Sequence, residues 1–356
     1  MLYFGLTNAL FMLRFALSSE QRLRQQSYFL VLIGLFLFSS FRYMVGCDWP
    51  GYYNQYLIAE NIDWSYVINS REPIWWTLLW WIRDMGLPYP VVNIVSSAVF
   101  FIGVHILARR QPDPLGFMVL LFPILIINMP MSTIRQGAAI GLVCIAFAAF
   151  IDRRQVWFTF WVVIAAGWHS SALIFLLLLP VATGKYTKSR LAMLAILAIP
   201  GTLLLASGET AEIASSRYIG TGKEAFGAVF RLGLLGLSTL YFFLFVREKW
   251  MRTFPHDYSL ASIGAIGMGL AFLLLPISSV IGDRLGYYFI PIQTIIFTRI
   301  QYLPFRFNHS LHSALPYAGL LLFFFVWTQY SEHFQQCFIP YKSWLFGFPD
   351  GNQSGF

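Results

Sequence analysis

Apolar residues follow one another in long runs along almost the whole chain, and short polar stretches separate these runs. Because the apolarity is continuous and does not alternate with a period of two, it favours helices over the strands of a β-barrel. The pattern predicts an all-α fold, a polytopic integral membrane helix bundle of about 12 transmembrane helices, each of about 20 apolar residues. We expect a single transmembrane domain over residues 1–356. The expected spans are 2–17, 27–44, 90–107, 115–130, 136–151, 155–169, 171–183, 191–207, 228–246, 259–280, 285–299 and 312–330.

One apolar run is too short to cross a bilayer comfortably. Residues 74–86, IWWTLLWWIRDMG, contain Arg83 and Asp84 and predict a short re-entrant helix. If this helix only dips into the membrane, the Lys and Arg residues of the later loops stay mostly on one side, whereas a full crossing would reverse every later loop. The charges therefore favour the re-entrant interpretation.

Composition agrees with a membrane protein, since 58% of the residues are hydrophobic and 11% are charged, against about 25% charged in a typical soluble domain. The formal net charge of +8 would suggest a nucleic-acid partner in a soluble protein. Here we attribute it to topology, because Lys and Arg retain loops in the cytoplasm, and we expect no nucleic-acid partner. Most of the 24 Lys and Arg residues then lie in inner loops, and both termini lie outside.

Three stretches are predicted to cap the bundle on its outer face. They are the loop 45–73, which follows Arg42, the loop 207–227 and the tail 331–356, whose aromatic residues suit a membrane interface. The first apolar run lacks a basic leader and a small-residue cleavage site, so we interpret it as a retained span and not as a signal peptide.

Several kinds of chemistry are disfavoured, because their sequence motifs are missing. There is no Walker-type phosphate loop, no H-E-x-x-H, no C-x-x-C and no Asp-x-Asp pair to bind a metal-bound nucleotide diphosphate. We therefore expect neither ATP hydrolysis nor metal-dependent sugar-nucleotide chemistry, and no cofactor or metal. The three cysteines are too few for a disulfide framework and lack the spacing of metal ligands. A bridge between Cys47 and Cys337 would need both to face outward, and we do not predict it.

Arg135 is the first candidate for chemistry. It lies in INMPMSTIRQGAAIG, where Pro130 ends one span and Ser132 or Thr133 can cap the next. Free backbone amides and the positive end of the helix dipole then face the same aqueous pocket as the guanidinium, which suits a phosphate or diphosphate. The alternative is that Arg135 snorkels to lipid headgroups. We favour anion binding, because arginines on the outer face run against the topological trend.

A second motif follows the same logic. In ISSVIGDRLGYYF, Asp283 is expected to cap a helix whose second residue is Arg284, with Tyr287 and Tyr288 one turn later. An intrahelical arrangement of Asp283 and Arg284 with an aromatic belt explains the pattern equally well. Further candidates to bind the same anion are Arg42 and Arg217.

Asp48, Glu72 and His169 are the candidates for proton transfer, because a sugar hydroxyl is activated by a carboxylate or an imidazole. His169, at the outer junction of two spans, could also orient a diphosphate. The alternatives are turn formation by Asp48, capping or pairing with Arg71 by Glu72, and ordinary core bonding by His169. Nearby aromatic residues suit stacking on sugars or packing in the interfacial belt equally well. They are Trp49, Tyr52, Tyr53, Trp64 and Tyr66.

The motifs FRYMVGCDWPGYY, SREP, STIRQGAA, GWHSSAL and DRLGYYF, with a late PYKSWL, occur in this order along nearly the whole chain. Together they resemble the EpsG family of bacterial exopolysaccharide proteins, which are similar to Wzy-type polysaccharide polymerases. Cys47 departs from the family pattern at a place where a small polar residue such as Thr or Ser is expected. The resemblance carries functional roles to Arg42, Gly46, Asp48, Tyr52, Glu72, Arg135, Gln136, His169 and Arg284.

What the resemblance implies is transfer of a growing glycan from a polyprenyl diphosphate carrier to a sugar hydroxyl of another lipid-linked repeat unit, at the outer face of the bacterial cytoplasmic membrane. The product would be exopolysaccharide, capsule or O-antigen. Arg135, helped by Arg284 and His169, would neutralise the leaving diphosphate, while Asp48 or Glu72 takes the acceptor proton without a metal. Expected partners are the lipid-linked donor and acceptor, the bilayer, a chain-length regulator and a flippase.

The alternative function is a transporter or flippase for lipid-linked oligosaccharide. It would need charged or broken-helix elements near the membrane midplane and usually internal repeats, and the sequence shows neither clearly. Arg14, Arg83 and Arg231 lie within hydrophobic segments and keep this alternative open, because charge inside a membrane is functional by default.

Overall fold

A computed structural model describes residues 2–18, 20–182 and 226–348, together with residues 187, 189 and 192. Within this part of the chain the regular elements are all helices, which confirms the predicted all-α class. The one strand-like pairing among these residues is an isolated antiparallel bridge between Arg42 and Ser343. Contacts divide the chain into two compact units. Unit 1 comprises Met1–Ile145, Val163–Ala172 and Ala314–Phe356, and unit 2 comprises Ala146–Val162 and Leu173–Ser313.

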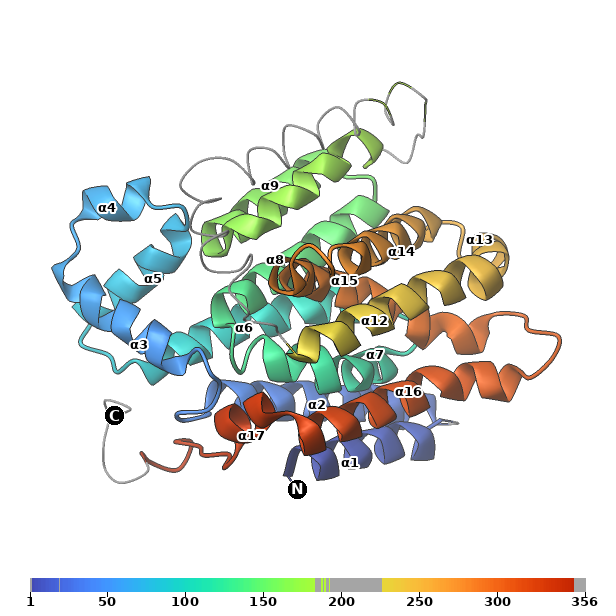
Figure 1. Cartoon of the computed structure of the whole chain (residues 1–356), viewed down its shortest axis with the longest axis horizontal. Coiled ribbons are helices and arrows are strands. Elements are labelled where there is room, and N and C mark those ends of the chain that lie inside the picture. The colour runs from blue at the N-terminus through green and yellow to red at the C-terminus, as the bar shows by residue number, and fades with distance from the viewer. Residues whose placement is uncertain are drawn as a thin grey trace. The chain divides into compact units, whose positions relative to one another are not determined.

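Unit 1 contains most of the N-terminal helices and a group of short helices in place of the predicted outer loop (Figure 1). Its main helices are α1 (Leu2–Ala16), α2 (Gln21–Ser40), α6 (Pro90–Ala108), α7 (Pro114–Leu121) and parts of α8 (Ile134–Ile151), α9 (Gln155–Trp168) and α16 (His309–Tyr330). Its shorter elements are α3 (Trp49–Ile58), η1 (Ala59–Asn61), α4 (Trp64–Asn69), α5 (Pro73–Asp84), the π-helical turn η2 (Phe122–Ile126), the start of the 3₁₀ helix η3 (Ser170–Val181) and α17 (Glu332–Phe338).

The core of unit 1 is built around α7 and η2. Nearly all of their side chains are buried, and α1, α2 and α6 pack against α7. The wide turn of η2 has a local cause, because Pro123 has no N–H to donate and its ring clashes with the preceding turn. Small residues let α6 and α8 touch through their backbones, since a Cβ added to Gly103 would lie 1.8 Å from the Gly141 carbonyl oxygen.

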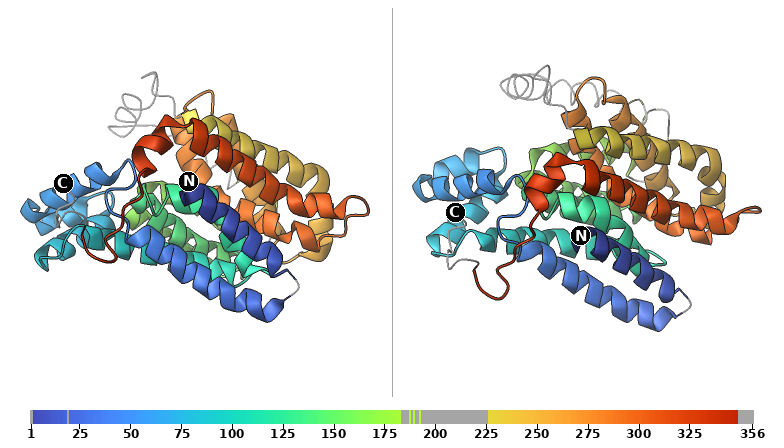
Figure 2. Two further views of the ribbon diagram at one scale, coloured as in Figure 1. Left: turned by 90° about the horizontal axis from the view of Figure 1, so that it is seen from below. Right: turned by 60° about the horizontal axis from the view of Figure 1, so that its bottom comes forward.

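The helices α3, α4 and α5 gather at one end of unit 1 (Figures 1 and 2). Pro73 opens α5, where its missing N–H costs nothing and its fixed φ suits the first helical turn. The side chains of Trp75, Leu79 and Ile82 form the buried stripe of α5. A helix at the predicted re-entrant segment is therefore present, while its depth in a membrane stays a prediction.

Unit 2 is built on three mutually packed helices, α12, α14 and α15. A buried hydrogen bond from the Gln293 amide to the Ser238 hydroxyl (2.7 Å) links α15 to α12. At its far end α12 runs through a π-helical turn into a short helix. The elements of unit 2 are α12 (Phe226–Tyr241), the π-helical turn η4 (Phe242–Val246), α13 (Arg247–Thr253), α14 (Tyr258–Leu273), α15 (Ser279–Arg299) and η5 (Ile300–Tyr302).

Four helices among the described residues are long and apolar enough to cross a membrane, namely Pro90–Ala108, Ile134–Ile151, Gly227–Thr253 and His309–Tyr330. Five shorter apolar helices of 10–17 residues accompany them. The predicted count of about 12 spans is not confirmed, and the span 191–207 falls almost wholly outside the described residues. Helix α2 begins at Gln21 although apolar residues start later, because Gln and Arg favour helix nearly as well as Leu.

Candidate active site

The segment that follows α2 is bound along its backbone by residues from near the end of the described chain. The Trp344 N–H donates to the Phe41 carbonyl (2.9 Å), and the Tyr43 N–H donates to the Lys342 carbonyl (2.9 Å). These bonds satisfy backbone groups that no helix satisfies. Residues 41–47 therefore have a fixed path before the first candidate site residue, although they form no helix.

A disulfide joins Cys47 to Cys337, and the Gly46 N–H donates to the Cys337 carbonyl (2.7 Å). Our expectation that these cysteines stay unbridged was wrong, because partners 290 residues apart leave no local pattern. The ring nitrogen Nδ1 of His333 lies 3.4 Å from the Cys47 sulfur, and the three ligand atoms lie within 4.8 Å of one another. Reduced cysteines with His333 would supply three zinc ligands, whereas the disulfide leaves no thiolate to bind a metal.

Gly46 brings this segment against the turn before α8. Its φ of +100° suits glycine, and a Cβ at this position would lie 2.1 Å from the Met131 carbonyl oxygen and 2.9 Å from the Ser132 Cα. Both neighbours are backbone atoms, which cannot turn away as a side chain does. The absence of a side chain at Gly46 therefore sets the distance between the start of α3 and the start of α8.

Asp48 lies at this junction, immediately before α3. Its carboxylate is exposed and accepts a hydrogen bond from the Thr133 hydroxyl (3.0 Å). We expected Ser132 or Thr133 to cap α8, and the Thr133 hydroxyl is instead directed to Asp48. Because Thr133 lies two residues before Arg135, this bond places the carboxylate of Asp48 beside the first turn of α8.

Arg135 pairs with Glu72, and this ion pair lies in the same region. The Nη1 atom of Arg135 contacts one carboxylate oxygen of Glu72, and the other oxygen accepts the backbone N–H of Ser170 (3.1 Å). A Cβ at Gly167 would meet the Ile74 side chain at 2.6 Å, so α5 packs closely on the end of α9 and brings Glu72 to Ser170. The Glu72 side chain is 11% exposed and the Arg135 side chain 26%, so the guanidinium is the more accessible partner.

Two aromatic rings flank the Arg135 guanidinium. Its carbon lies 5.5 Å from the Tyr52 ring centroid and 5.8 Å from the Trp75 ring, distances typical of cation–π contacts. Burial raises the pKa of Tyr52 to about 12. The positive charge of Arg135 lowers this pKa, whereas the negative charges of Asp48 and Glu72 raise it. Tyr52 therefore stays neutral at physiological pH among three charged candidates.

His169 follows α9 and directly precedes the residue whose amide binds Glu72. Its Nδ1 lies 2.7 Å from the Ser171 hydroxyl oxygen, which fixes the orientation of the half-buried ring. The predicted position of His169 at a helix junction therefore agrees with the structure. Its role in proton transfer stays a prediction.

Two predicted anion ligands are buried in the packing of unit 1. Arg42 is 1% exposed, and its guanidinium donates to the carbonyls of Ser39 (2.9 Å) and Val45 (3.0 Å) and to the Asn93 side chain (3.0 Å). Gln136 is 0% exposed. We therefore assign Arg42 to fixing the loop backbone and do not place either residue against the anion.

The remaining predicted residues lie in other parts of the chain. Helix α15 begins at Ser279 and is capped by the Ser278 hydroxyl, so the expected cap at Asp283 is wrong. Asp283 instead accepts two hydrogen bonds from Arg231 (2.6 and 2.8 Å). Arg284 is exposed, whereas Tyr287 and Tyr288 are buried in unit 2. Arg217 and most of the predicted outer loop 207–227 lie outside the described residues.

Three arginines within hydrophobic segments each have a carboxylate partner. Arg14 pairs with Asp113 (2.8 Å), Arg83 contacts Glu60, and Arg231 pairs with Asp283. The first two pairs lie in unit 1 and the third in unit 2. These ion pairs explain how the three charges are accommodated without a transport pathway.

Several contacts at the site were missed by the sequence reasoning. Thr133 was considered only as a helix cap, Trp75 only as part of a short apolar run, and the Ser170 amide not at all. A hydroxyl and an arginine two residues apart at a helix start were the available signal for Thr133. The other two depend on packing between helices and have no local signal.

Comparison with known proteins identifies a family for this chain. The model of the EpsG family, a family of Wzy-type polysaccharide polymerase-like proteins, matches residues 26–343. No curated protein and no solved structure matches the chain. The matched range includes Asp48, Glu72, Arg135, His169 and the Cys47–Cys337 bridge, and it covers most of the sequence. Together with the apolar helices, the match indicates a membrane protein with a polymerase-like role in polysaccharide biosynthesis, and the chain belongs to the EpsG family.

Proposed function

We propose that this protein is a membrane glycosyltransferase that joins polyprenyl-diphosphate-linked oligosaccharide repeat units into a polysaccharide. The observation that supports the proposal most is the grouping of Arg135, Glu72 and Tyr52 beside the exposed carboxylate of Asp48. A cation, a carboxylate and aromatic rings in one place suit a substrate that combines a diphosphate with sugars.

Arg135 binds the diphosphate of the donor. Its guanidinium is partly exposed, and only one of its terminal nitrogens contacts Glu72 through a described bond. An arginine keeps its charge at all physiological pH values and offers paired N–H groups to phosphate oxygens. Glu72 and the two rings hold the guanidinium in one orientation, so Glu72 acts as a positioning residue in this proposal.

Asp48 is the general base. Of the three candidates it is the exposed carboxylate, whereas Glu72 is paired with Arg135 and His169 is bonded to Ser171. The hydrogen bond from Thr133 orients the Asp48 carboxylate and leaves lone pairs for an acceptor hydroxyl.

The reaction is a displacement at the anomeric carbon of the donor sugar. The acceptor hydroxyl oxygen forms a bond to this carbon, and its proton moves to the Asp48 carboxylate. The bond between the anomeric carbon and the diphosphate oxygen breaks, and its electron pair stays on the diphosphate. Arg135 stabilises the charge that develops there. Since Arg135 supplies the positive charge that stabilises the leaving diphosphate, the proposed reaction needs no metal. Extension of the glycan should therefore continue in the presence of a chelator.

The polyprenyl carrier places the reaction at a membrane, and the topology expected from the charges places the site on the outer face of the bacterial cytoplasmic membrane. Exopolysaccharide, capsule and O-antigen are all compatible products. A flippase that delivers the lipid-linked unit and a chain-length regulator are the expected partners.

The test is extension of a defined lipid-linked oligosaccharide by the purified protein. Asp48→Asn should lower kcat by about 100-fold or more, because the acceptor proton loses its base. Arg135→Gln should lower it by about 100-fold, because the leaving diphosphate loses its counter-charge.

Matched controls are available in the same outer loop. Asp63→Asn and Arg71→Gln remove the same charges from exposed side chains with no described hydrogen bond or ion pair, and both should keep normal activity. Normal extension by Asp48→Asn and Arg135→Gln would reject the assigned roles. Substrate that accumulates on the inner face of cells carrying these variants would instead favour the transport function.

A further inference from the structure

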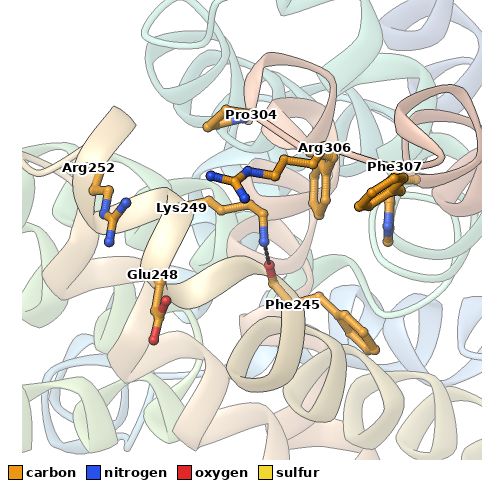
Figure 3. A pocket seen from close by; sticks show the side chains of 9 residues that line it. Phe245, Glu248, Lys249, Arg252, Pro304, Arg306 and Phe307 are labelled. Carbon is orange, nitrogen blue, oxygen red and sulfur yellow. Dashed lines mark hydrogen bonds between the residues drawn. The ribbon is translucent and has the colours of Figure 1, made fainter.

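Unit 2 contains a basic pocket that the proposed reaction does not use. Its volume is about 560 Å³, and the residues that give it its chemistry come from α13, from the chain after η5 and from the start of α16. Arg306 extends toward the helix that carries Lys249 and Arg252 (Figure 3). The lining residues used below are Glu248, Lys249, Arg252, Phe305, Arg306 and His312.

The described residues that line the pocket carry an excess of positive charge. Lys249, Arg252 and Arg306 line it with a single carboxylate, that of Glu248. The side chains of Arg252 and Arg306 are exposed and have no hydrogen bond or ion pair among the described residues. The Lys249 amine donates to the Phe245 carbonyl (3.1 Å).

Other arginines in the same part of unit 2 are used differently. Arg299 pairs with Asp257 (2.5 Å), and Arg247 donates to the Tyr258 hydroxyl (2.9 Å). Arg252 and Arg306 differ from these arginines, because their guanidinium groups are exposed and have no partner among the described residues.

Two stacked rings line the pocket. Phe305 and His312 stack with their ring centroids 4.0 Å apart, the Lys249 amine lies 4.9 Å from the Phe305 ring, and the His312 ring accepts or donates a hydrogen bond with Tyr241 (2.8 Å). On the other side of α13, Trp250 is fully buried. Because Trp250 is buried in the packing of unit 2, α13 is held with Lys249 and Arg252 lining the pocket.

The pocket lies at one end of a helix of unit 2 that is long and apolar enough to cross a membrane. This helix, Gly227–Thr253, has 27 residues, and Lys249 and Arg252 lie near its C-terminal end. About 20 apolar residues are enough to cross the hydrocarbon core. The charge pattern predicts that the cations at this end are cytoplasmic. Large apolar side chains beside it are exposed, with Leu244 71% and Phe307 83% accessible. Cations next to exposed apolar side chains are the pattern of a lipid-binding interface.

We propose that this pocket binds the phosphate headgroup of an anionic phospholipid of the cytoplasmic leaflet. Lys249, Arg252 and Arg306 contact the phosphate, while the acyl chains cover Leu244 and Phe307. The exposed Leu244 and Phe307 favour a lipid as the ligand, because its acyl chains would remove these side chains from water. A soluble phosphate or an acidic protein segment would leave them exposed. The site is separate from the glycan chemistry and stands whether or not the polymerase proposal holds.

The test is native mass spectrometry of the full chain titrated with phosphatidylglycerol or phosphatidylcholine. The pocket variant is Lys249→Gln/Arg252→Gln/Arg306→Gln, and the matched control is Arg22→Gln/Arg24→Gln/Arg154→Gln, which removes three other cations predicted to be cytoplasmic. The pocket variant should bind phosphatidylglycerol roughly 100-fold more weakly. The control and the wild type should bind it alike, and both should prefer it to phosphatidylcholine.

Equal binding by the pocket variant and the control would overturn the proposal. So would equal binding of the two lipids by the wild type, or full displacement of the lipid by millimolar inorganic phosphate, which would assign the pocket to a soluble ligand. If the triple variant does not fold, Arg252→Gln alone gives the same test, with a weakening of about fivefold.

Discussion

Replacing Gly46 with alanine tests whether the close approach of residues 41–47 to the turn before α8 sets the geometry of the candidate site. The added Cβ would lie 2.1 Å from the Met131 carbonyl oxygen, where real Cβ contacts are essentially never below 3.0 Å. The two backbones must therefore separate by roughly 1 Å, and a misplacement of this size can lower a rate by about 100-fold. The left-handed φ of +100° adds a strain of about 1–2 kcal/mol for alanine. The Thr133 hydrogen bond to Asp48 (3.0 Å) would break with this movement.

The assay compares Gly46→Ala with Gly51→Ala in extension of a lipid-linked oligosaccharide and in polymer length in cells. Gly51 lies in α3 with no atom near its would-be Cβ, so alanine there should be tolerated. We expect kcat to fall by about 100-fold for Gly46→Ala alone, with normal amounts of protein in the membrane. Equal activity of the two variants would refute the reasoning that the Gly46 contact sets the site.

Three further predictions concern the rest of the chain. Asp283→Asn leaves the Arg231 charge unpaired at a site where both side chains are under 15% exposed, so it should destabilise the protein by about 3 kcal/mol, measured as a lower Tm of the purified protein. An unchanged Tm would contradict a structural role for the pair. Cys47→Ser should raise the number of free thiols per denatured, unreduced chain from one to two, because it releases Cys337. Maleimide counting that finds three free thiols in the wild type would exclude the bridge. A single cysteine in place of Arg153, in a chain whose native cysteines are serines, should resist labelling from outside intact cells, and ready labelling would reverse the predicted topology.

The main helices could be predicted from the sequence because their signal is local. The expected spans 90–107 and 155–169 correspond to helices Pro90–Ala108 and Gln155–Trp168, and the Pro residue that opens the first is visible in the sequence. The short helices of the predicted outer loop were missed, because α3 and α4 are polar and aromatic on most sides and lack an apolar period.

The candidate site could be predicted as a set of residues but not as a set of contacts. Arg135 and Glu72 were each selected for their charge, yet their pairing depends on how α5 packs against α9 and α8. Arg42 was expected to face an anion, since a charged residue in a polar stretch is usually exposed. Arg42 is buried because its guanidinium donates hydrogen bonds to the backbone carbonyls of Ser39 and Val45. Those carbonyls come close to the guanidinium only in the folded path of residues 39–45.

The clasp between residues 41–47 and residues 337–344 has a consequence for how the protein is made. The strand-like bridge, the backbone hydrogen bonds and the disulfide all join a segment translated early to one translated 290 residues later. Until the later segment has been synthesised and has reached the same side of the membrane, Tyr43 and Gly46 have no partners for these bonds. The proposed reaction centre would then be assembled last, so that a nascent chain stays inert until its synthesis is nearly complete.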